Sequence, residues 1–188
     1  QIGAPLPDNL RQMSWKTILT ALEAGKMKGV GDAMSAAERE SIAKAFGTAE
    51  SAAMPASANC PAGPPLKSTR SISNRADWNG WADAANTRFQ NAKAAGLSRA
   101  NTPKLKLKWA FGFPGVTTAL GTPTVFDGRV YVGAADGAVY SLDARNGCVY
   151  WVYTAASGVR VAPVIGSTLG AGRSVYFGDL RGYVYALD

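Results

Sequence analysis

The chain contains no histidine among its 188 residues. This absence excludes histidine-ligated metal sites, a Ser-His-Asp triad and covalent haem attachment through C-x-x-C-H within these residues. Two cysteines are too few for a scaffold held mainly by disulfides. No apolar run approaches the roughly 18 residues that a membrane-spanning helix needs. There is neither a starting Met nor a signal-peptide pattern, and we interpret Gln1 as a processed or excised start.

The excess of positive charge is confined to the middle of the chain. The net charge is +7, and residues 51–110 carry nine basic and two acidic side chains, whereas the flanking parts are balanced. Such a stretch is typical of a surface that meets an anionic partner or cofactor, or of a solvated linker and strand surface. No zinc-finger, homeodomain or aromatic RNA-binding signature accompanies the charge, so we predict no nucleic-acid partner.

Residues 1–50 have the spacing of helices. Apolar side chains from Trp15 to Leu22 fall on one face of a helix. Residues 35–38 read Ser-Ala-Ala-Glu, which is a capping box, and a second apolar face follows from Ile42 to Phe46. Two helices of about a dozen residues are marginal alone in water, so we expect their apolar faces to need a partner surface.

The rest of the chain changes character twice. Residues 51–75 are rich in Ala, Ser and Pro and predict a linker or an extended strap. Residues 105–188 consist of short alternating runs rich in Val, Tyr and Phe, separated by Gly and Asp. Within them, residues 128–143 align without a gap to residues 173–188, a period of 45 residues. An all-β repeat of this length is typical of a β-propeller blade.

A turn motif within this repeat carries a family resemblance. Residues 141–151 contain Asp143, Gly147 and Trp151 at a spacing of four. This run resembles the tryptophan-docking motif of pyrroloquinoline-quinone (PQQ) alcohol dehydrogenases. The resemblance implies that the Gly permits a tight turn between the third and fourth strands of a blade. The Trp then packs flat against the neighbouring blade, and Trp109 stands in the corresponding position one repeat earlier.

A second motif stands upstream. Residues 78–89 begin Trp-Asn-Gly-Trp and end Asn-Thr-Arg-Phe, and residues 105–109 read Leu-Lys-Leu-Lys-Trp. This combination is similar to the start of the propeller in these quinoproteins, where the second run is a strand. The residues of these runs are most similar to those of the polyvinyl alcohol dehydrogenase branch. The resemblance covers about residues 76–188.

The helical part resembles the C-terminal half of a cytochrome c domain, which often precedes the propeller in this branch. Met27 occupies the place of the family's sixth iron ligand, and a soft thioether suits low-spin haem iron. The C-x-x-C-H half is absent, so we expect no haem c to bind to this chain alone. Met27 is an axial ligand only if an upstream haem-binding half exists; otherwise it is a flexible core filler.

The resemblance also implies PQQ with calcium over a central channel, and electron transfer from PQQ to haem c. Arg160 is the first candidate for binding a PQQ carboxylate, because it precedes the strand expected next to the channel. Arg88, within Asn-Thr-Arg, is the second. A structural salt bridge or a surface charge is the alternative for both. No residue here matches the catalytic carboxylate, and we assign no metal ligand.

Two readings of Cys60 and Cys148 stay open. A disulfide would tie the strap to the first blade and close a loop of 88 residues, which stabilises a chain by roughly 4 kcal/mol in the chain-entropy model. Two unrelated thiols are the alternative. A bridge fits the periplasmic or secreted location that the resemblance implies.

The expected fold class is an α+β multi-domain fragment. A small helical, cytochrome c-like half lies at residues 1–50, a linker or strap at 51–75, and the first blades of an all-β quinoprotein propeller at 76–188. One and a half repeats do not close a propeller, so we expect the remainder of the propeller, or another polypeptide, to complete the sheets.

The expected function is that of a segment of a PQQ-dependent alcohol dehydrogenase-like quinohaemoprotein, acting on an alcohol or polymer-alcohol substrate and not catalytic alone. The alternative is a non-catalytic propeller-repeat scaffold or accessory subunit that docks through the basic middle segment.

Overall fold

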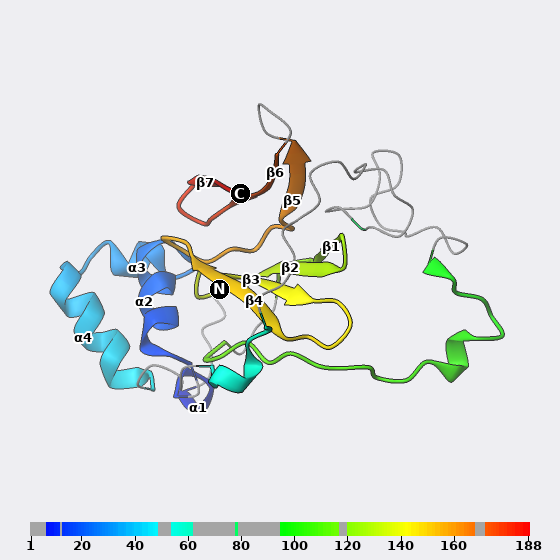
Figure 1. Cartoon of the computed structure of the whole chain (residues 1–188). Coiled ribbons are helices and arrows are strands. Elements are labelled where there is room, and N and C mark those ends of the chain that lie inside the picture. The colour runs from blue at the N-terminus through cyan, green and yellow to red at the C-terminus, as the bar shows by residue number, and fades with distance from the viewer. Residues whose placement is uncertain are drawn as a thin grey trace.

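A computed structural model describes residues 7–11, 13–48, 54–61, 78, 95–116, 120–167 and 172–188. Helices occupy the first part of the described chain and antiparallel strands the last part (Figure 1). The α-helices are α1 (Pro7–Leu10), α2 (Trp15–Glu23), α3 (Lys28–Gly31) and α4 (Ala36–Phe46). Single 3-10 turns lie at Ala56–Ala58 and Thr102–Lys104. No helix in the described ranges is long and apolar enough to cross a membrane.

The two longer helices begin at hydroxyl caps. The Ser14 hydroxyl accepts a hydrogen bond from the backbone N–H of Thr17 at the start of α2. Before α4, the predicted capping box forms with both of its hydrogen bonds, between Ser35 and Glu38. Helix α2 ends at Glu23, one residue after the predicted apolar face. These caps fix where each helix starts and therefore which residues face inwards.

The helices share a small apolar core. Ile18 and Leu22 of α2 pack with Ala43 of α4, and all three are buried. Because Gly31 lies against the backbone of Leu22, helix α3 approaches α2 at a point where a larger residue would collide. The apolar faces predicted for residues 1–50 thus meet each other.

The strands form two antiparallel sheets. The first has the order β1-β2-β3-β4 and the second β5-β6-β7. Their bounds are β1 (Thr124–Phe126), β2 (Arg129–Gly133), β3 (Ala138–Asp143), β4 (Val149–Thr154), β5 (Val164–Ser167), β6 (Arg173–Gly178) and β7 (Val184–Leu187). Consecutive strands are neighbours in each sheet, which is the arrangement of a propeller blade.

The sequence repeat is a structural repeat with the same register. Tyr131 of β2 faces Ser141 of β3 in the first sheet. The residues 45 positions later, Tyr176 and Ala186, face each other in the second sheet. The gapless alignment therefore superimposes the second and third strands of the two sheets.

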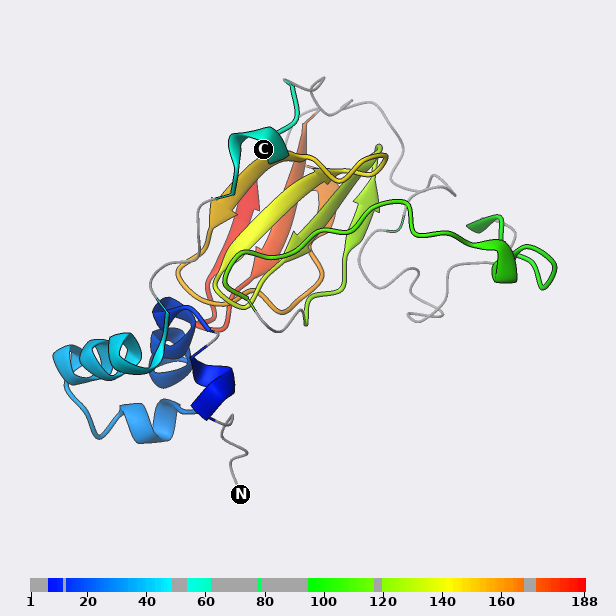
Figure 2. The same cartoon turned by 90° about the horizontal axis from the view of Figure 1, so that it is seen from below.

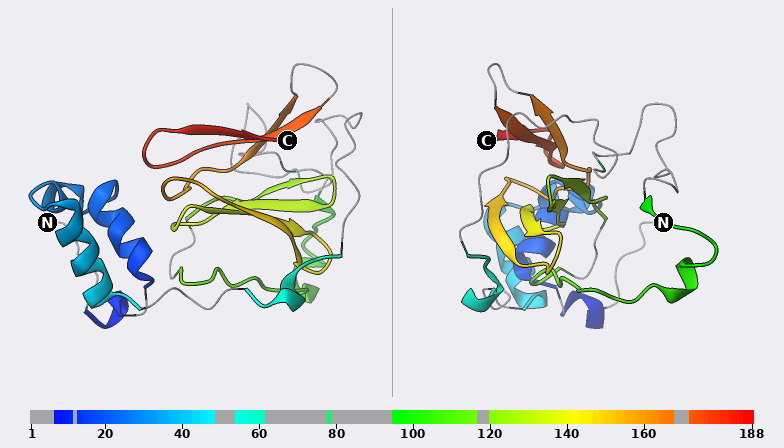
Figure 3. Two further views of the ribbon diagram at one scale, coloured as in Figure 1. Left: turned by 60° about the vertical axis from the view of Figure 1, so that its left-hand side comes forward. Right: turned by 45° about the vertical axis from the view of Figure 1, so that its right-hand side comes forward.

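Three layers stack on one another. Buried residues of both sheets, including Phe126, Val139 and Phe177, form the core between the sheets. The other face of the first sheet, with Tyr140 and Leu142, is covered by aromatic residues of the segment 109–113. Figure 3 shows this segment and the second sheet on opposite sides of the first sheet. The helices lie beside one end of the sheets (Figures 2 and 3).

The β1 edge of the first sheet is paired with another part of the chain. Trp78 forms an antiparallel bridge with Val125 of β1. The backbone N–H of each residue donates to the carbonyl of the other, and both distances are 2.7 Å. The motif predicted to start the propeller thus begins on the side of β1 that faces away from β2.

The strand predicted at residues 105–109 does not form. These residues are without regular secondary structure, because a strand requires a backbone partner and none lies beside them in the described part of the chain. Trp109 nevertheless packs on the first sheet, whereas Leu105 and Leu107 are exposed.

Candidate functional site

The docking turn brings Trp109 onto Gly147. The indole Nε1–H of Trp109 donates to the Ala144 carbonyl at 3.2 Å. Gly147 has a φ of +77°, and a Cβ placed there would lie 2.7 Å from Cε3 of the indole ring. Glycine is required here for two independent reasons, the left-handed backbone and the contact with the ring.

Asp143 organises the same turn as a buried anion. Its carboxylate accepts hydrogen bonds from the backbone N–H of Arg145 at 2.7 Å and from the Tyr150 hydroxyl at 2.7 Å. The Arg145 guanidinium adds an ion pair at 3.2 Å. Burial alone raises the pKa of Asp143, but these hydrogen bonds and the ion pair outweigh it and lower the pKa to about 2. The carboxylate is therefore ionised at neutral pH and serves the turn, because its acceptor positions are used.

Trp151 of β4 stands one repeat after Trp109. It pairs with Ser141 of β3, and its ring centroid lies 6.0 Å from that of Tyr131. Beside it lies an open hollow of about 380 Å³, lined by Trp151, Val152, Tyr153, Ala186, Leu187 and Asp188. Trp109 has a glycine turn against its ring, whereas Trp151 borders this hollow.

The two cysteines are joined. Cys60 and Cys148 form a disulfide with a Cα–Cα distance of 5.1 Å. The backbone N–H of Cys60 also donates to the Val149 carbonyl at 2.9 Å. Since Cys148 follows Gly147 directly, the bridge fastens residues 54–61 to the docking turn. Of the two readings left open by the sequence, the structure has the bridge.

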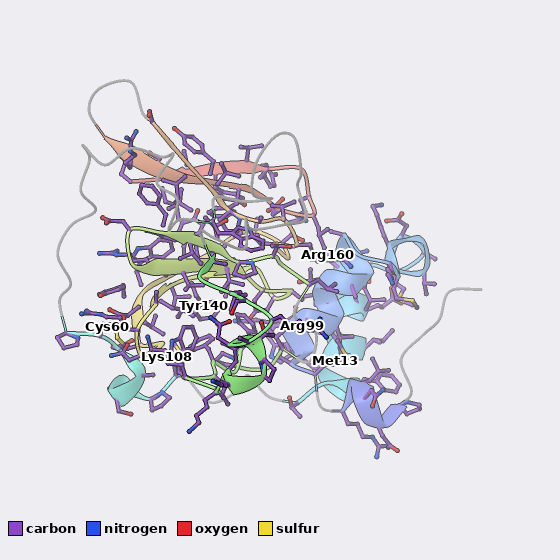
Figure 4. The ribbon with its side chains drawn as sticks, turned by 90° about the vertical axis from the view of Figure 1, so that its right-hand side faces the viewer. Met13, Cys60, Arg99, Lys108, Tyr140 and Arg160 are labelled. Atoms are coloured by element: carbon purple, nitrogen blue, oxygen red, sulfur yellow. A yellow bond between two sulfur atoms is a disulfide. The ribbon has the colours of Figure 1, made fainter. Side chains whose placement is uncertain are left out.

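Arg160 lies at the end of the sheets that faces the helices (Figure 4). It follows Val159, which is fully buried and donates its N–H to the Ala134 carbonyl at 2.9 Å. Three residues later the Pro163 carbonyl accepts a hydrogen bond from the Thr124 hydroxyl. The backbone is thus held on both sides, while the Arg160 side chain is exposed and makes no ion pair with a described residue.

Strand β5 begins at Val164 and is an edge strand of the second sheet. The sequence predicted that the innermost strand of a blade, next to the channel, begins at residues 161–163, and the observed strand begins slightly later. Arg88, the second candidate for a PQQ carboxylate, lies outside the described residues.

Met27 lies in an apolar hollow of the helical part. The hollow holds about 210 Å³ and is lined only by apolar side chains, namely Leu10, Met13, Ile18, Ala21, Leu22, Met27, Ile42 and Phe46. The sequence had pointed to Met27 alone. Met13 supplies a second thioether to the lining of the hollow. It lies two residues before α2, and its position just ahead of that helix was the signal available in the sequence.

The described residues contain no group of three His, Cys, Asp or Glu side chains that could hold a metal ion. Tyr150 and Arg145, the partners of Asp143, were missed by the sequence analysis. The only available signal was their position around a predicted turn, which does not specify a hydrogen bond.

The comparisons with known proteins agree with this architecture. The family model described as outer membrane protein assembly factor BamB, a model of PQQ-type repeats, matches residues 82–188. The chain belongs to this PQQ-repeat family. The antiparallel sheets of this PQQ-repeat protein fit a fragment of such a propeller.

Two curated relatives have the same name. Polyvinylalcohol dehydrogenase of Sphingopyxis sp. (strain 113P3) is 33% identical over 189 residues, covering 91% of this chain and 28% of that protein. Polyvinylalcohol dehydrogenase of Pseudomonas sp is 34% identical over 206 residues, covering 100% of this chain and 32% of that protein. This PQQ-repeat chain therefore spans less than a third of the length of these relatives.

Proposed function

We propose that the chain is a segment of a PQQ-dependent alcohol dehydrogenase that oxidises an alcohol or a polymer alcohol. The observation that carries the proposal is the identity of 33% and 34% to two polyvinylalcohol dehydrogenases across nearly the whole chain. The docking turn supports it, because Trp109 packs on Gly147 and donates to the Ala144 carbonyl, which agrees with the docking motif of the family. The domain boundaries proposed are residues 1–50, 51–75 and 76–188.

The Arg160 guanidinium suits one carboxylate of PQQ. It is exposed and unpaired with other described residues, and its backbone is held by the Val159 and Pro163 hydrogen bonds. A planar fork of donors binds a carboxylate through two hydrogen bonds. When bound, PQQ supplies the electron acceptor for alcohol oxidation. We therefore assign Arg160 a binding role and no catalytic one.

Calcium and haem c fit the described residues less well. No described cluster of carboxylates could hold calcium, so its ligands would come from elsewhere in the protein. The hollow at Met27 is apolar and offers a thioether, which suits one side of a haem. Since the chain has no histidine, the other axial ligand would also come from outside it. We derive no electron-transfer step through these groups.

The test uses the intact polypeptide that carries this segment, reconstituted with PQQ and calcium. We expect PQQ-dependent reduction of an artificial electron acceptor with polyvinyl alcohol or a simple secondary alcohol. Substituting Arg160→Gln is expected to weaken PQQ binding roughly tenfold or more, and Arg160→Lys less. Arg181→Gln, a change of another exposed arginine on the turn after β6, is the matched control. Equal PQQ affinity in all variants would remove Arg160 from the site, and absence of any PQQ-dependent activity would refute the enzyme.

A second candidate is a non-catalytic propeller scaffold or accessory subunit. It is favoured by the description of the matching family model, which is that of an assembly factor. The exposed lysines at 104, 106 and 108 supply the basic docking surface that this role requires. It predicts a native polypeptide near 19.6 kDa that binds neither PQQ nor haem, and native mass together with cofactor titration separates the two candidates.

We further propose a periplasmic or secreted location. The disulfide between Cys60 and Cys148 supports it, because such bonds persist in oxidising compartments. Cell fractionation followed by thiol labelling tests it. A cytosolic protein with two free thiols would contradict the assignment.

A further inference from the structure

The loop that connects β4 to β5, here called the Arg160 loop (residues 155–163), is bonded to the first sheet. Ala155 at its start donates its backbone N–H to the Gly137 carbonyl at 2.9 Å. Val159 adds the bond described above, and both acceptors lie in the turn between β2 and β3. The first sheet therefore fixes the backbone of this loop on both sides of its middle.

The second sheet holds the same loop through two further hydrogen bonds. In the turn between β6 and β7, Leu180 donates its backbone N–H to the Gly158 carbonyl at 3.0 Å. Ala156 donates its N–H to the hydroxyl of Tyr185, the second residue of β7, also at 3.0 Å. This turn lies at the same end of the sheets as the loop (Figure 3). The Arg160 loop is thus held between two sheets.

Asp179 supports both contacts from the second sheet. One of its carboxylate oxygens accepts a hydrogen bond from the Tyr185 hydroxyl at 2.8 Å. The other accepts from the backbone N–H groups of Arg181 at 2.9 Å and Tyr183 at 3.0 Å, and so shapes the turn whose main chain reaches the loop. The first contact extends a chain that runs from the Ala156 N–H through the phenol to the carboxylate. A charged acceptor at the end of such a chain strengthens both of its hydrogen bonds.

The carboxylate at residue 179 departs from the sequence repeat. Residues 45 positions apart correspond, so Tyr185 corresponds to Tyr140 and Asp179 to Ala134. The Tyr140 ring packs against Phe111, with centroids 5.1 Å apart. The turn of the first sheet therefore folds with alanine at the position where the second sheet has aspartate. We infer that this carboxylate serves the loop beside it more than the turn that contains it.

We propose that Asp179, acting through Tyr185, is a positioning residue for Arg160 in the binding of a PQQ carboxylate. The inference rests on the proposed function, because it takes Arg160 as the group that meets the cofactor. Ordering a loop and a long side chain on binding costs free energy, and a loop that is already fixed reduces this cost. Side chains that hold a binding group in place therefore add to affinity without touching the ligand.

Hydrogen–deuterium exchange without PQQ tests the support of the loop, using the intact polypeptide that carries this segment. Tyr185→Phe removes the hydroxyl and keeps the ring, which stacks on Phe177 with centroids 5.0 Å apart. We expect the amide of Ala156 to exchange roughly two- to tenfold faster. Tyr183→Phe, at a tyrosine that is 58% exposed, is the matched control and should leave this exchange unchanged. Equal exchange in the wild type and Tyr185→Phe would overturn the proposal.

Titration of the same proteins with PQQ in the presence of calcium tests the consequence for binding. We expect Tyr185→Phe and Asp179→Ala each to weaken PQQ binding roughly two- to tenfold. Asp179→Asn should weaken it less, because the amide oxygen can still accept from the turn. Tyr183→Phe should bind PQQ as the wild type does. A wild-type protein that binds PQQ with the same affinity as Tyr185→Phe and Asp179→Ala would refute the positioning role and leave the proposed function standing.

A double-mutant cycle separates positioning from a general effect on folding. In a background with Arg160→Gln, adding Tyr185→Phe should cause little further loss of PQQ affinity, because the guanidinium that it positions is gone. A further loss of the same size as in the wild-type background would show that Tyr185 does not act through Arg160, and would overturn the proposal. Absence of PQQ binding by the wild-type protein would refute the proposed function and this role together.

Discussion

The contact between Trp109 and Gly147 yields a prediction with a closely matched control. Gly147 and Gly128 have nearly the same backbone conformation, with φ of +77° and +76°. A Cβ at Gly147 would lie 2.7 Å from the indole ring, whereas a Cβ at Gly128 would meet nothing within 4 Å. Alanine at either position therefore incurs the same backbone penalty, about 1 kcal/mol, but only Gly147→Ala must also displace the ring.

Displacing a packed ring costs about 1–3 kcal/mol in a well-packed core. We therefore expect Gly147→Ala to lower the free energy of unfolding by about 2–4 kcal/mol and Gly128→Ala by about 1 kcal/mol. The assay is chemical denaturation followed by tryptophan fluorescence and circular dichroism. In a background with Trp109→Ala the excess loss at Gly147 should largely disappear, because the ring is no longer there. Equal losses for the two glycines, or an excess that persists without the indole, would show that the ring does not rest on this turn.

Two further predictions concern the same turn. The pKa of Asp143 is lowered to about 2 from its ordinary value of 3.8, so its contribution to stability, about 2 kcal/mol, is complete above pH 4 and is lost as the pH falls towards 2. Asp143→Asn should flatten the acid limb of the unfolding free energy measured against pH, and an unchanged limb would contradict the assignment. Reducing the bridge between Cys60 and Cys148 frees a loop of 88 residues, which should cost about 4 kcal/mol. Denaturation with and without reductant measures this loss, and alkylation of both thiols in the unreduced protein would show that no bridge exists.

The sheets were largely predictable because their signal is local and repeated. The match of residues 128–143 to residues 173–188 predicted two units, and their β-strand registers agree. The capping box at Ser35 was predictable for the same reason, since both of its partners lie within one helical turn. A pattern of this kind is recorded in the sequence itself.

Features that depend on distant partners were not predictable. The strand expected at residues 105–109 lacks a partner, and no property of Leu107 reveals that. The hydrogen bond from Tyr150 to Asp143 depends on how a turn folds back on itself. Arg160 was selected from its place before a strand, but whether its guanidinium is paired depends on residues remote in the sequence. Spacing specifies elements, whereas packing specifies the environment of their side chains.

The bridge between Trp78 and Val125 limits what can bind along the β1 edge of the first sheet. In an antiparallel ladder the N–H and C=O groups of alternate residues point to the same side, and in three-residue β1 only those of Val125 point away from β2. Both groups are already bonded to Trp78. Strand β1 therefore has no main-chain donor or acceptor to offer at its edge, and a ligand or another strand that approaches this edge must be recognised by side chains and by the loops at the ends of the strands.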